Sequence, residues 1–412
     1  MKITNVTAHA LSSPIRPARE HEFLGGTRKI LKRDFVLVTV ETADGEIGYA
    51  PAGASSSAMR EYFDGATHRN FVEVIDDVIE PTLEDEVIDD VTAAHDLIDD
   101  INIPGFLRSQ IISAIDIALH DIIGKRQNAP IYELLLEQSD VTADPDRTLP
   151  LYASGGMYMP PEGYAEEAAG LAEYGFEGYK YRPGLGPEED LRTIRLIREE
   201  VGDEMEIMVD AHTWWKMGDK SYSPDQVREL TSKFQDYDVY WVEEPVEPEA
   251  HSAYQELREA TGTPLAGGES EESPQGLKRL ADTGAVDFLQ GDVRHHRGFT
   301  GCGDVVEHCE GADVTFVPHH FGTHLGLVAN AHLVAAAPGS ELLEYPVFET
   351  SRHPGMYPFP LAEDILESPF DVEGGELTVP DEPGLGVDVN LDVLTEYPYE
   401  EGAWTEFHYD EA

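Results

Sequence analysis

Three acidic residues each follow a short apolar run in the second half of the chain. They are Asp210 in EIMVDAH, Glu243 in VYWVEEP and Glu269 in PLAGGES. Each run reads as a strand and precedes a helical stretch, so successive β–α steps would return a carboxylate to the same end of a sheet. Carboxylate oxygens are the ligands that a hard dication such as Mg²⁺ prefers. The spacing therefore predicts a Mg²⁺ site.

Two histidines accompany these acids. His212 lies two residues after Asp210, and His319 lies in VTFVPHHF, another apolar run. Residues two apart on a strand share a face, so we expect His212 and Asp210 to point into the same site. Imidazoles that neighbour a metal-bound anion indicate acid–base chemistry.

The elements that must position these side chains alternate regularly from Leu149 onwards. Strand-like runs, separated by helical stretches, appear at LPLYASGG, EGYKYRPG, EIMVDAH, VYWVEEP, TPLAGGES, AVDFLQGDV, DVTFVPHHF and ELLEYPV. Eight strands and seven helices over about 200 residues predict an α/β fold, a (β/α)7β TIM-like barrel. We expect the acids at the C-terminal strand ends, where barrels carry their functional groups. A doubly wound open sheet is less favoured, because no G-x-G-x-x-G motif opens a helix after the first strand.

The chain is expected to divide into three parts. Residues 1–135 read as an α+β capping domain, residues 149–350 as the barrel, and residues 351–412 as a C-terminal segment that returns to the capping domain. Alternating apolar residues around the Asp-Gly turn of DFVLVTVETADGEIGYAPA predict a hairpin in the first part. The polar stretch 137–148 lacks periodicity and reads as the linker.

Two segments of the capping domain, 16–29 and 50–63, are expected to close over the barrel mouth as loops. The first contains Gly25 and Gly26, which suit a lid that moves, and several basic residues that could meet an anionic, hydroxylated ligand. Excluding water in this way would strengthen the electrostatic interactions inside the site.

The composition excludes several classes of partner. The chain has 81 Asp+Glu against 28 Lys+Arg, a net charge of −53. Such a surface disfavours nucleic acid and anionic membranes. It suits a halophilic protein, because the Debye length in molar salt is about 3 Å and self-repulsion is muted. Only Cys302 and Cys309 are present, and no run resembles a signal peptide or a transmembrane segment, so we expect no disulfide framework and a cytoplasmic protein.

The motifs in this order resemble the mandelate racemase subgroup of the enolase superfamily, and the likeness spans nearly the whole chain. The resemblance implies metal ligands at the ends of the third, fourth and fifth barrel strands, namely Asp210, Glu243 and Glu269. It assigns a His–Asp dyad to His319 and Asp292 of LQGDV, and a glutamate on the eighth strand to Glu344 of ELLEY. Asp292 would orient the His319 imidazole and raise its basicity.

The second barrel strand departs from that pattern. The subgroup usually carries Lys-x-Lys there, whereas this chain has Lys180-Tyr181-Arg182. Arginine does not lose its proton in proteins, so Arg182 cannot act as a base, although it can clamp a carboxylate. A racemase that needs a base on each face of the α-carbon is therefore less favoured. We expect Lys180 and Arg182 to point inward and to bind the anionic substrate.

The Asp-x-His arrangement of Asp210 and His212 resembles the acid-sugar dehydratases. In these enzymes the strand-three histidine protonates the departing 3-hydroxyl while the His–Asp dyad removes the C2 proton. The resemblance implies a Mg²⁺-dependent hydro-lyase that converts an aldonate, a small-molecule sugar acid, to its 2-keto-3-deoxy acid. D-gluconate and D-xylonate are favoured, with D-galactonate and L-arabinonate as further candidates.

Two alternative functions stay open. One is a racemase, epimerase or cycloisomerase of the same superfamily, and the other is a non-catalytic relative that only binds a ligand. The family likeness also suggests a homo-oligomer.

Overall fold

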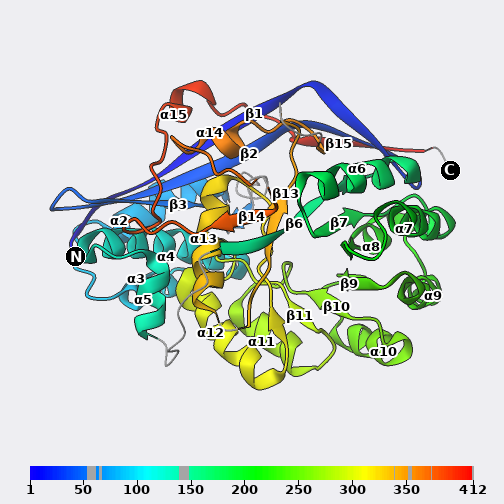
Figure 1. Ribbon diagram of the computed structural model, residues 1–412. Coiled ribbons are helices and arrows are strands. Elements are labelled where there is room, and N and C mark those ends of the chain that lie inside the picture. The colour runs from blue at the N-terminus through cyan, green and yellow to red at the C-terminus, as the bar shows by residue number, and fades with distance from the viewer. Residues whose placement is uncertain are drawn as a thin grey trace.

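The first part of the chain forms an antiparallel sheet around one long hairpin. The computed structural model describes residues 1–52, 62–64, 67–138, 148–337, 339–350, 355–372 and 374–410. Strand β1 (Ile3–Phe23) pairs with β2 (Gly26–Thr42) along nearly its full length. Gly25 makes the turn with a φ of 90°, which glycine adopts without a steric penalty. The other edge of β2 pairs with β3 (Ile47–Pro51) and β15 (Thr405–Tyr409), so the chain's last strand lies beside its first hairpin (Figure 1).

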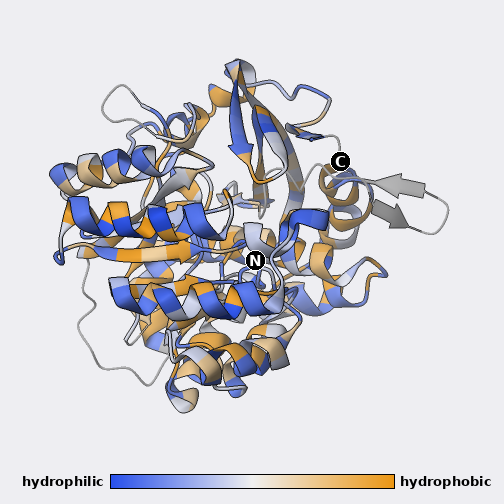
Figure 2. Cartoon of the chain, turned by 90° about the vertical axis from the view of Figure 1, so that its right-hand side faces the viewer, coloured by the Kyte–Doolittle hydropathy of each residue, from blue (hydrophilic) through white to orange (hydrophobic). Residues whose placement is uncertain are grey.

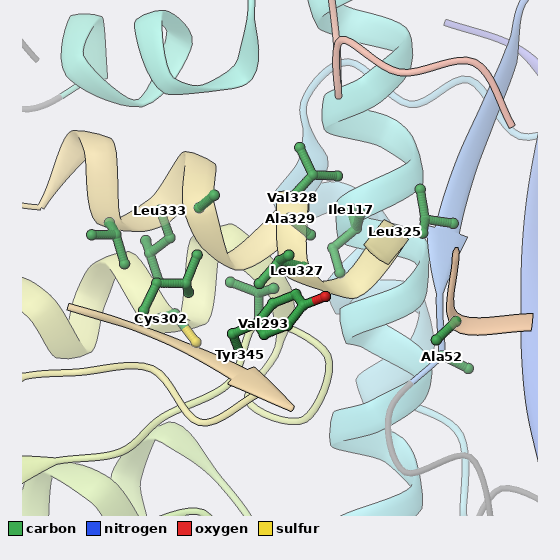
Figure 3. Close-up of a cluster of buried hydrophobic side chains, with 14 of the residues drawn as sticks. Ala52, Ile117, Val293, Cys302, Leu325, Leu327, Val328, Ala329, Leu333 and Tyr345 are labelled. Atoms are coloured by element: carbon green, nitrogen blue, oxygen red, sulfur yellow. The ribbon is translucent and has the colours of Figure 1, made fainter. Parts of the chain in front are cut away.

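Helices follow this sheet in the chain. They are α1 (Phe71–Val74), α2 (Glu80–Leu83), α3 (Val91–Asp99), α4 (Gly105–Gln127) and α5 (Ile131–Gln138). A π-helical turn at Ile75–Ile79 lies between α1 and α2, and the short strands β4 (Tyr62–Asp64) and β5 (Thr67–Arg69) precede α1. Helix α4 is buried on most of its surface because it lies between the sheet and the barrel helices α12 and α13 (Figure 3).

The second part is the predicted TIM-like barrel, and this prediction is confirmed. Parallel strands pair in the order β12-β11-β10-β9-β8-β7-β6-β13. Their bounds are β6 (Thr148–Met157), β7 (Gly178–Arg182), β8 (Glu206–Asp210), β9 (Val239–Glu243), β10 (Leu265–Gly267), β11 (Phe288–Leu289), β12 (Thr315–Phe316) and β13 (Leu343–Pro346). The helices between them are α6 (Pro161–Tyr174), α7 (Pro187–Val201), α8 (Thr213–Lys216), α9 (Pro224–Phe234), α10 (His251–Thr261), α11 (Pro274–Asp282), α12 (Gly298–Ala312) and α13 (His324–Ala336).

Hydrophilic and hydrophobic residues alternate along the outer helices in Figure 2, and helices such as α7 and α9 bury the apolar residues of one face. Helix α13 differs, because it is buried over nearly its whole length, including its polar residues His324, Asn330 and His332. Its side chains Leu325, Leu327 and Val328 pack with Ile117 of α4 in the cluster of Figure 3. No helix in the described ranges is long and apolar enough to cross a membrane.

The segment expected to be a mobile loop over the mouth is instead the tip of the β1–β2 hairpin. Residues 16–29 continue both strands through a tight turn, and the Leu24 amide donates to the Gly184 carbonyl after β7 at 2.7 Å. The ladder hydrogen bonds of the hairpin outweigh the local flexibility that glycines suggest. Most of the second expected loop, 50–63, lies outside the described residues, as does most of the predicted linker.

The C-terminal segment crosses the barrel before it reaches the sheet. It contains α14 (Leu361–Asp364), β14 (Glu376–Thr378) and α15 (Val393–Glu396), and β14 pairs antiparallel with β6. The division at residues 135, 149 and 351 stays a prediction.

A buried acid ties the barrel to helix α4. Asp116 is 0% exposed, lies 3.0 Å from His95 Nε2 and 3.2 Å from His120 Nδ1, and accepts from the Phe299 amide of α12 at 2.7 Å. Burial would raise the pKa of Asp116, but His120 and His95 hold it well below its ordinary value. The carboxylate is therefore ionised, and its loss would leave its donors unpaired.

We predict that Asp116→Ala destabilises the fold by about 3 kcal/mol, the typical cost of breaking a buried charge pair. The control is Asp225→Ala, because the side chain of Asp225 is 86% exposed in its ion pair with Arg228. Such a surface pair is worth at most about 1 kcal/mol. Urea unfolding followed by circular dichroism measures both midpoints. Equal midpoints for the two variants would contradict the structural role of Asp116.

Candidate active site at the barrel mouth

The three predicted metal ligands meet at the C-terminal ends of adjacent strands. Asp210 is the last residue of β8, Glu243 is the last residue of β9 and its direct partner in the ladder, and Glu269 follows β10. The side chains of Asp210 and Glu243 are 0% exposed, and that of Glu269 is 17% exposed. Parallel strands in register therefore bring the carboxylates together, as their spacing predicts.

These ligands form two adjacent groups that share His212. Asp210, His212 and Glu243 offer ligand atoms within 4.8 Å of one another, and so do His212, Glu244 and Glu269. Strand spacing does not predict Glu244 in these ligand groups, because successive strand residues point to opposite faces. Glu244 has left the strand, with a φ of 40° before Pro245. That turn lets two successive glutamates face one site.

Glu244 is held firmly in this position. Its Oε2 lies 2.6 Å from His212 Nε2 and accepts from Ser270 Oγ at 2.8 Å, while its carbonyl accepts from Trp215 Nε1 at 2.8 Å. Backbone strain at a non-glycine residue persists only where the surroundings fix it. The signal in the sequence is the pair of glutamates before a proline, which leaves one position of ambiguity.

Lys180 and Arg182 both face the carboxylates, as expected from their spacing. Lys180 Nζ lies 2.9 Å from Glu243 Oε2 and 2.7 Å from Glu344 Oε1, and Arg182 Nε donates to Asp210 Oδ2. Burial would lower the pKa of Lys180, but Glu243 and Glu344 raise it well above its ordinary value. Lys180 is therefore a fixed positive charge.

The imidazoles of His212 and His319 converge on one carboxylate. His212 Nε2 lies 3.0 Å from Glu269 Oε1, and His319 Nε2 lies 3.0 Å from Glu269 Oε2. Burial lowers the pKa of His212, but Asp210, Glu269 and Glu244 raise it well above its ordinary value. For His319, Glu269 and the hydrogen bond to Asp292 outweigh burial and raise the pKa to about 9. The surrounding carboxylates thus favour the charged form of both imidazoles.

His319 and Asp292, which the family resemblance pairs, lie in contact, and two further residues hold Asp292. His319 Nδ1 lies 3.0 Å from Asp292 Oδ2, which orients the ring with Nε2 toward Glu269. Arg294 Nε donates to Asp292 Oδ1 at 3.0 Å and Asn330 Nδ2 donates to the same oxygen at 3.2 Å. Burial raises the pKa of Asp292, but Arg294 and His319 bring it well below its ordinary value. Arg294 carries no motif of its own in the sequence.

Glu344 lies on β13 with its side chain 0% exposed. Its Oε2 accepts from the His320 amide at 2.9 Å, next to His319. Gln290, which the sequence argument missed, donates from Nε2 to Glu243 Oε2 at 2.7 Å. The other oxygen of each carboxylate contacts Lys180, because Lys180 Nζ lies 3.0 Å from Glu243 Oε1 and 2.7 Å from Glu344 Oε1.

The donor set fits a hard divalent cation. In the described part of the mouth, six carboxylates face three permanent cations, namely Asp210, Glu243, Glu244, Glu269, Asp292 and Glu344 against Lys180, Arg182 and Arg294. Uncompensated buried charge is costly, so the excess requires protons on the histidines or a bound cation. The Glu269 oxygens face His212 and His319 at 3.0 Å, so a cation bound there would take over the charge compensation that the imidazoles provide. Asp210, Glu243 and Glu269 could hold Mg²⁺, with His212 and Glu244 beside them.

Comparison with protein families gives two matches that together span most of the chain. Residues 12–135 match the mandelate racemase / muconate lactonizing enzyme N-terminal domain, and residues 163–393 match the enolase C-terminal domain-like family. The second match alone covers more than half of the chain.

The individual relatives are named for more than one kind of reaction. The chain is 29% identical to the D-galactarolactone cycloisomerase of Agrobacterium fabrum over 96% of this chain and 99% of that protein. It is 28% identical to the D-xylonate dehydratase of Haloferax volcanii over 69% of this chain and 68% of that protein. Among solved structures, the 3,6-anhydro-D-galactonate cycloisomerase of Zobellia galactanivorans superposes with a TM-score of 0.78, 28% identity, and coverage of 97% of this chain and 100% of that chain.

We predict that Glu269→Gln weakens Mg²⁺ binding on the order of 100-fold, because an amide oxygen replaces a charged ligand. Isothermal titration in molar KCl, which screens cation binding to the acidic surface, measures the affinity. The control is Glu271→Gln, since Glu271 pairs with His251 at 2.6 Å and belongs to neither ligand group. Unchanged affinity in Glu269→Gln would remove Glu269 from the ligand set.

Proposed function

The chain belongs to the mandelate racemase / muconate lactonizing enzyme family of the enolase superfamily, and from this premise we propose that it is a Mg²⁺-dependent sugar-acid dehydratase. The proposed reaction removes the C2 proton of a sugar acid, expels the 3-hydroxyl as water and leaves the 2-keto-3-deoxy acid. The chain's relatives act on small molecules, several of them sugar acids by name.

The main support for this proposal is the position of two imidazoles beside Glu269. His212 Nε2 and His319 Nε2 each lie 3.0 Å from Glu269, on its two different oxygens. Hydroxide is a poor leaving group, so elimination needs an acid near C3 as well as a base near C2. Two imidazoles that approach one carboxylate from the segments after β8 and β12 can supply both.

We assign the base to His319. Its ring is oriented by Asp292, which Arg294 and Asn330 hold in turn. Glu269 is the main group that raises the pKa of His319, so drawing charge away from Glu269 would free Nε2 to accept the C2 proton. Asp292 is then the positioning partner that stabilises the imidazolium.

We assign the acid to His212. Asp210, Glu269 and Glu244 keep its pKa raised, so the ring carries the proton that the departing 3-hydroxyl needs. When the C2–H bond breaks, its electron pair forms the C2–C3 double bond and the C3–O bond breaks. The hydroxyl takes the proton of His212 and leaves as water, and the enol product becomes the 2-keto acid.

The remaining charges stabilise the substrate anion. Mg²⁺, held by Asp210, Glu243 and Glu269, would take up negative charge that develops on the substrate carboxylate. Lys180 and Arg182 supply fixed positive charge beside it, and Glu344 holds Lys180 at 2.7 Å. Loss of water from the mouth would strengthen each of these interactions.

The first substrates to test are D-gluconate and D-xylonate, followed by D-galactonate and L-arabinonate. These four acids share the configuration at C2 and C3, so one acid and one base can serve them all. Molar KCl is the proposed working condition because of the net charge of −53. A cytoplasmic homo-oligomer remains part of the proposal.

A second candidate is a cycloisomerase, and whole-length similarity favours it. The relative that matches 96% of this chain bears that name, whereas the xylonate dehydratase matches 69% of it. The same base could start either reaction. Product mass separates the two, because dehydration removes one water and ring opening or closing changes no mass.

We predict that His212→Asn abolishes loss of water while exchange of the C2 hydrogen with D₂O continues, because the acid is lost and the base remains. His319→Asn should abolish both. Mass spectrometry of the keto product and proton NMR of the substrate measure the two steps in the same sample. Turnover that survives in His319→Asn would show that another group is the base.

A further inference from the structure

A guanidinium of the capping hairpin lies over the barrel mouth. Arg28 is on β2 next to the hairpin tip, whose Leu24 amide donates to the Gly184 carbonyl after β7. Its Nη1 lies 3.7 Å from Met157 Sδ, and Met157 is the last residue of β6. Burial and, to a smaller extent, the charge of Arg182, the last residue of β7, lower the pKa of Arg28. Arg28 thus lies above the ends of the first two barrel strands.

Arg28 pairs with no carboxylate among the described residues. Its Nε donates to Thr405 Oγ1 at 3.2 Å, and its Cζ lies 4.7 Å from the Trp404 ring centre and 5.4 Å from that of Phe407. Burial lowers the pKa of Arg28, Tyr158 and Tyr357 raise it, and no acidic side chain is among the causes. In a chain with 81 acidic and 28 basic residues, a half-buried arginine without an acid beside it is unusual.

Aromatic rings connect this guanidinium to the reaction centre. The Arg182 Cζ lies 4.9 Å from the Phe321 ring centre, and the Arg33 Cζ lies 5.2 Å from the same ring. Arg33 in turn lies 5.4 Å from the Trp404 ring, which also contacts Arg28. The guanidiniums of Arg182, Arg33 and Arg28 are thus linked in a row by the rings of Phe321 and Trp404, from Asp210 to the hairpin.

We propose that Arg28 binds a second anionic group at the end of the substrate away from the metal, so that the preferred substrate is a sugar diacid or a phosphorylated sugar acid. The proposal rests on the proposed function, since the first carboxylate must lie at the metal ligands for the distal group to reach Arg28. A guanidinium fork matches a carboxylate or a phosphate through paired hydrogen bonds.

A purely structural role is the competing explanation. Arg28 stacks on Trp404 and Phe407, and such contacts could do no more than hold β15 on β2. That role predicts a lower melting temperature on substitution and the same fractional loss for every substrate. Substrate binding predicts a loss confined to substrates with a distal charge, so the ratio of kcat/KM values distinguishes the two explanations.

The experiment compares acids that differ only at the distal carbon. The panel is D-gluconate, D-glucarate and 6-phospho-D-gluconate, with D-galactonate and D-galactarate as a second matched pair. The wild-type protein should prefer the doubly charged member of a pair in kcat/KM. Arg28→Gln should lower that preference about 10- to 100-fold, and Arg28→Lys should restore part of it. Preference for glucarate or for the phosphate identifies the distal group.

Lys29→Gln is the matched control. Lys29 is the next residue of β2, so its side chain points to the opposite face of the sheet, and its ladder partners are Glu20 and Glu406. The substitution removes the same unit of charge from the same strand and should leave the ratio unchanged. Circular dichroism and melting temperatures confirm that each variant folds.

Each outcome decides one of the two claims. Turnover of gluconate without any preference for the doubly charged acids would overturn the role of Arg28 and leave the proposed function standing. Equal losses on both members of a pair in Arg28→Gln would assign Arg28 to structure. Absence of turnover and of calorimetric binding for every acid, with Mg²⁺ present, would overturn the proposed function itself.

Discussion

The excess of carboxylate charge at one end of the barrel is the constraint on which the rest of the site depends. Parallel strands in register place Asp210 beside Glu243, and the next strand adds Glu269. Buried anions require compensating positive charge. In the mouth, Lys180 and Arg182 pair with these carboxylates, and the carboxylates favour protonated imidazoles. The same imbalance that would destabilise an inert core gives this site its attraction for a dication and for protons.

The sequence predicts most of the framework because the barrel repeats one local pattern. Alternation of apolar strands and amphipathic helices identifies the barrel. The acids at strand ends identify the end of the barrel that carries the functional groups. These features depend on residues that lie close in the chain or recur once per β–α unit, which is why spacing suffices. The dyad of His319 and Asp292, in contrast, is implied by the family resemblance, and its two residues meet at 3.0 Å beyond the ends of β12 and β11.

Features that depend on turns or on distant segments cannot be found in this way. Glu244 joins the site only because the chain leaves the strand at a φ of 40°. Arg294 bonds to Asp292 through the turn that follows β11, and Asn330 reaches the same carboxylate from α13. The glycines at the hairpin tip suggest a loop, whereas pairing of β1 with β2 makes them a turn that carries Arg28 over the mouth.

The most direct test of the account is exchange of the C2 hydrogen of a sugar acid with D₂O, followed by NMR as a function of Mg²⁺. A dication at Asp210, Glu243 and Glu269 must be bound before His319 can remove that proton. We therefore expect no exchange after complete chelation and full recovery when Mg²⁺ is restored. Exchange that continues at an undiminished rate in the chelated protein would contradict it.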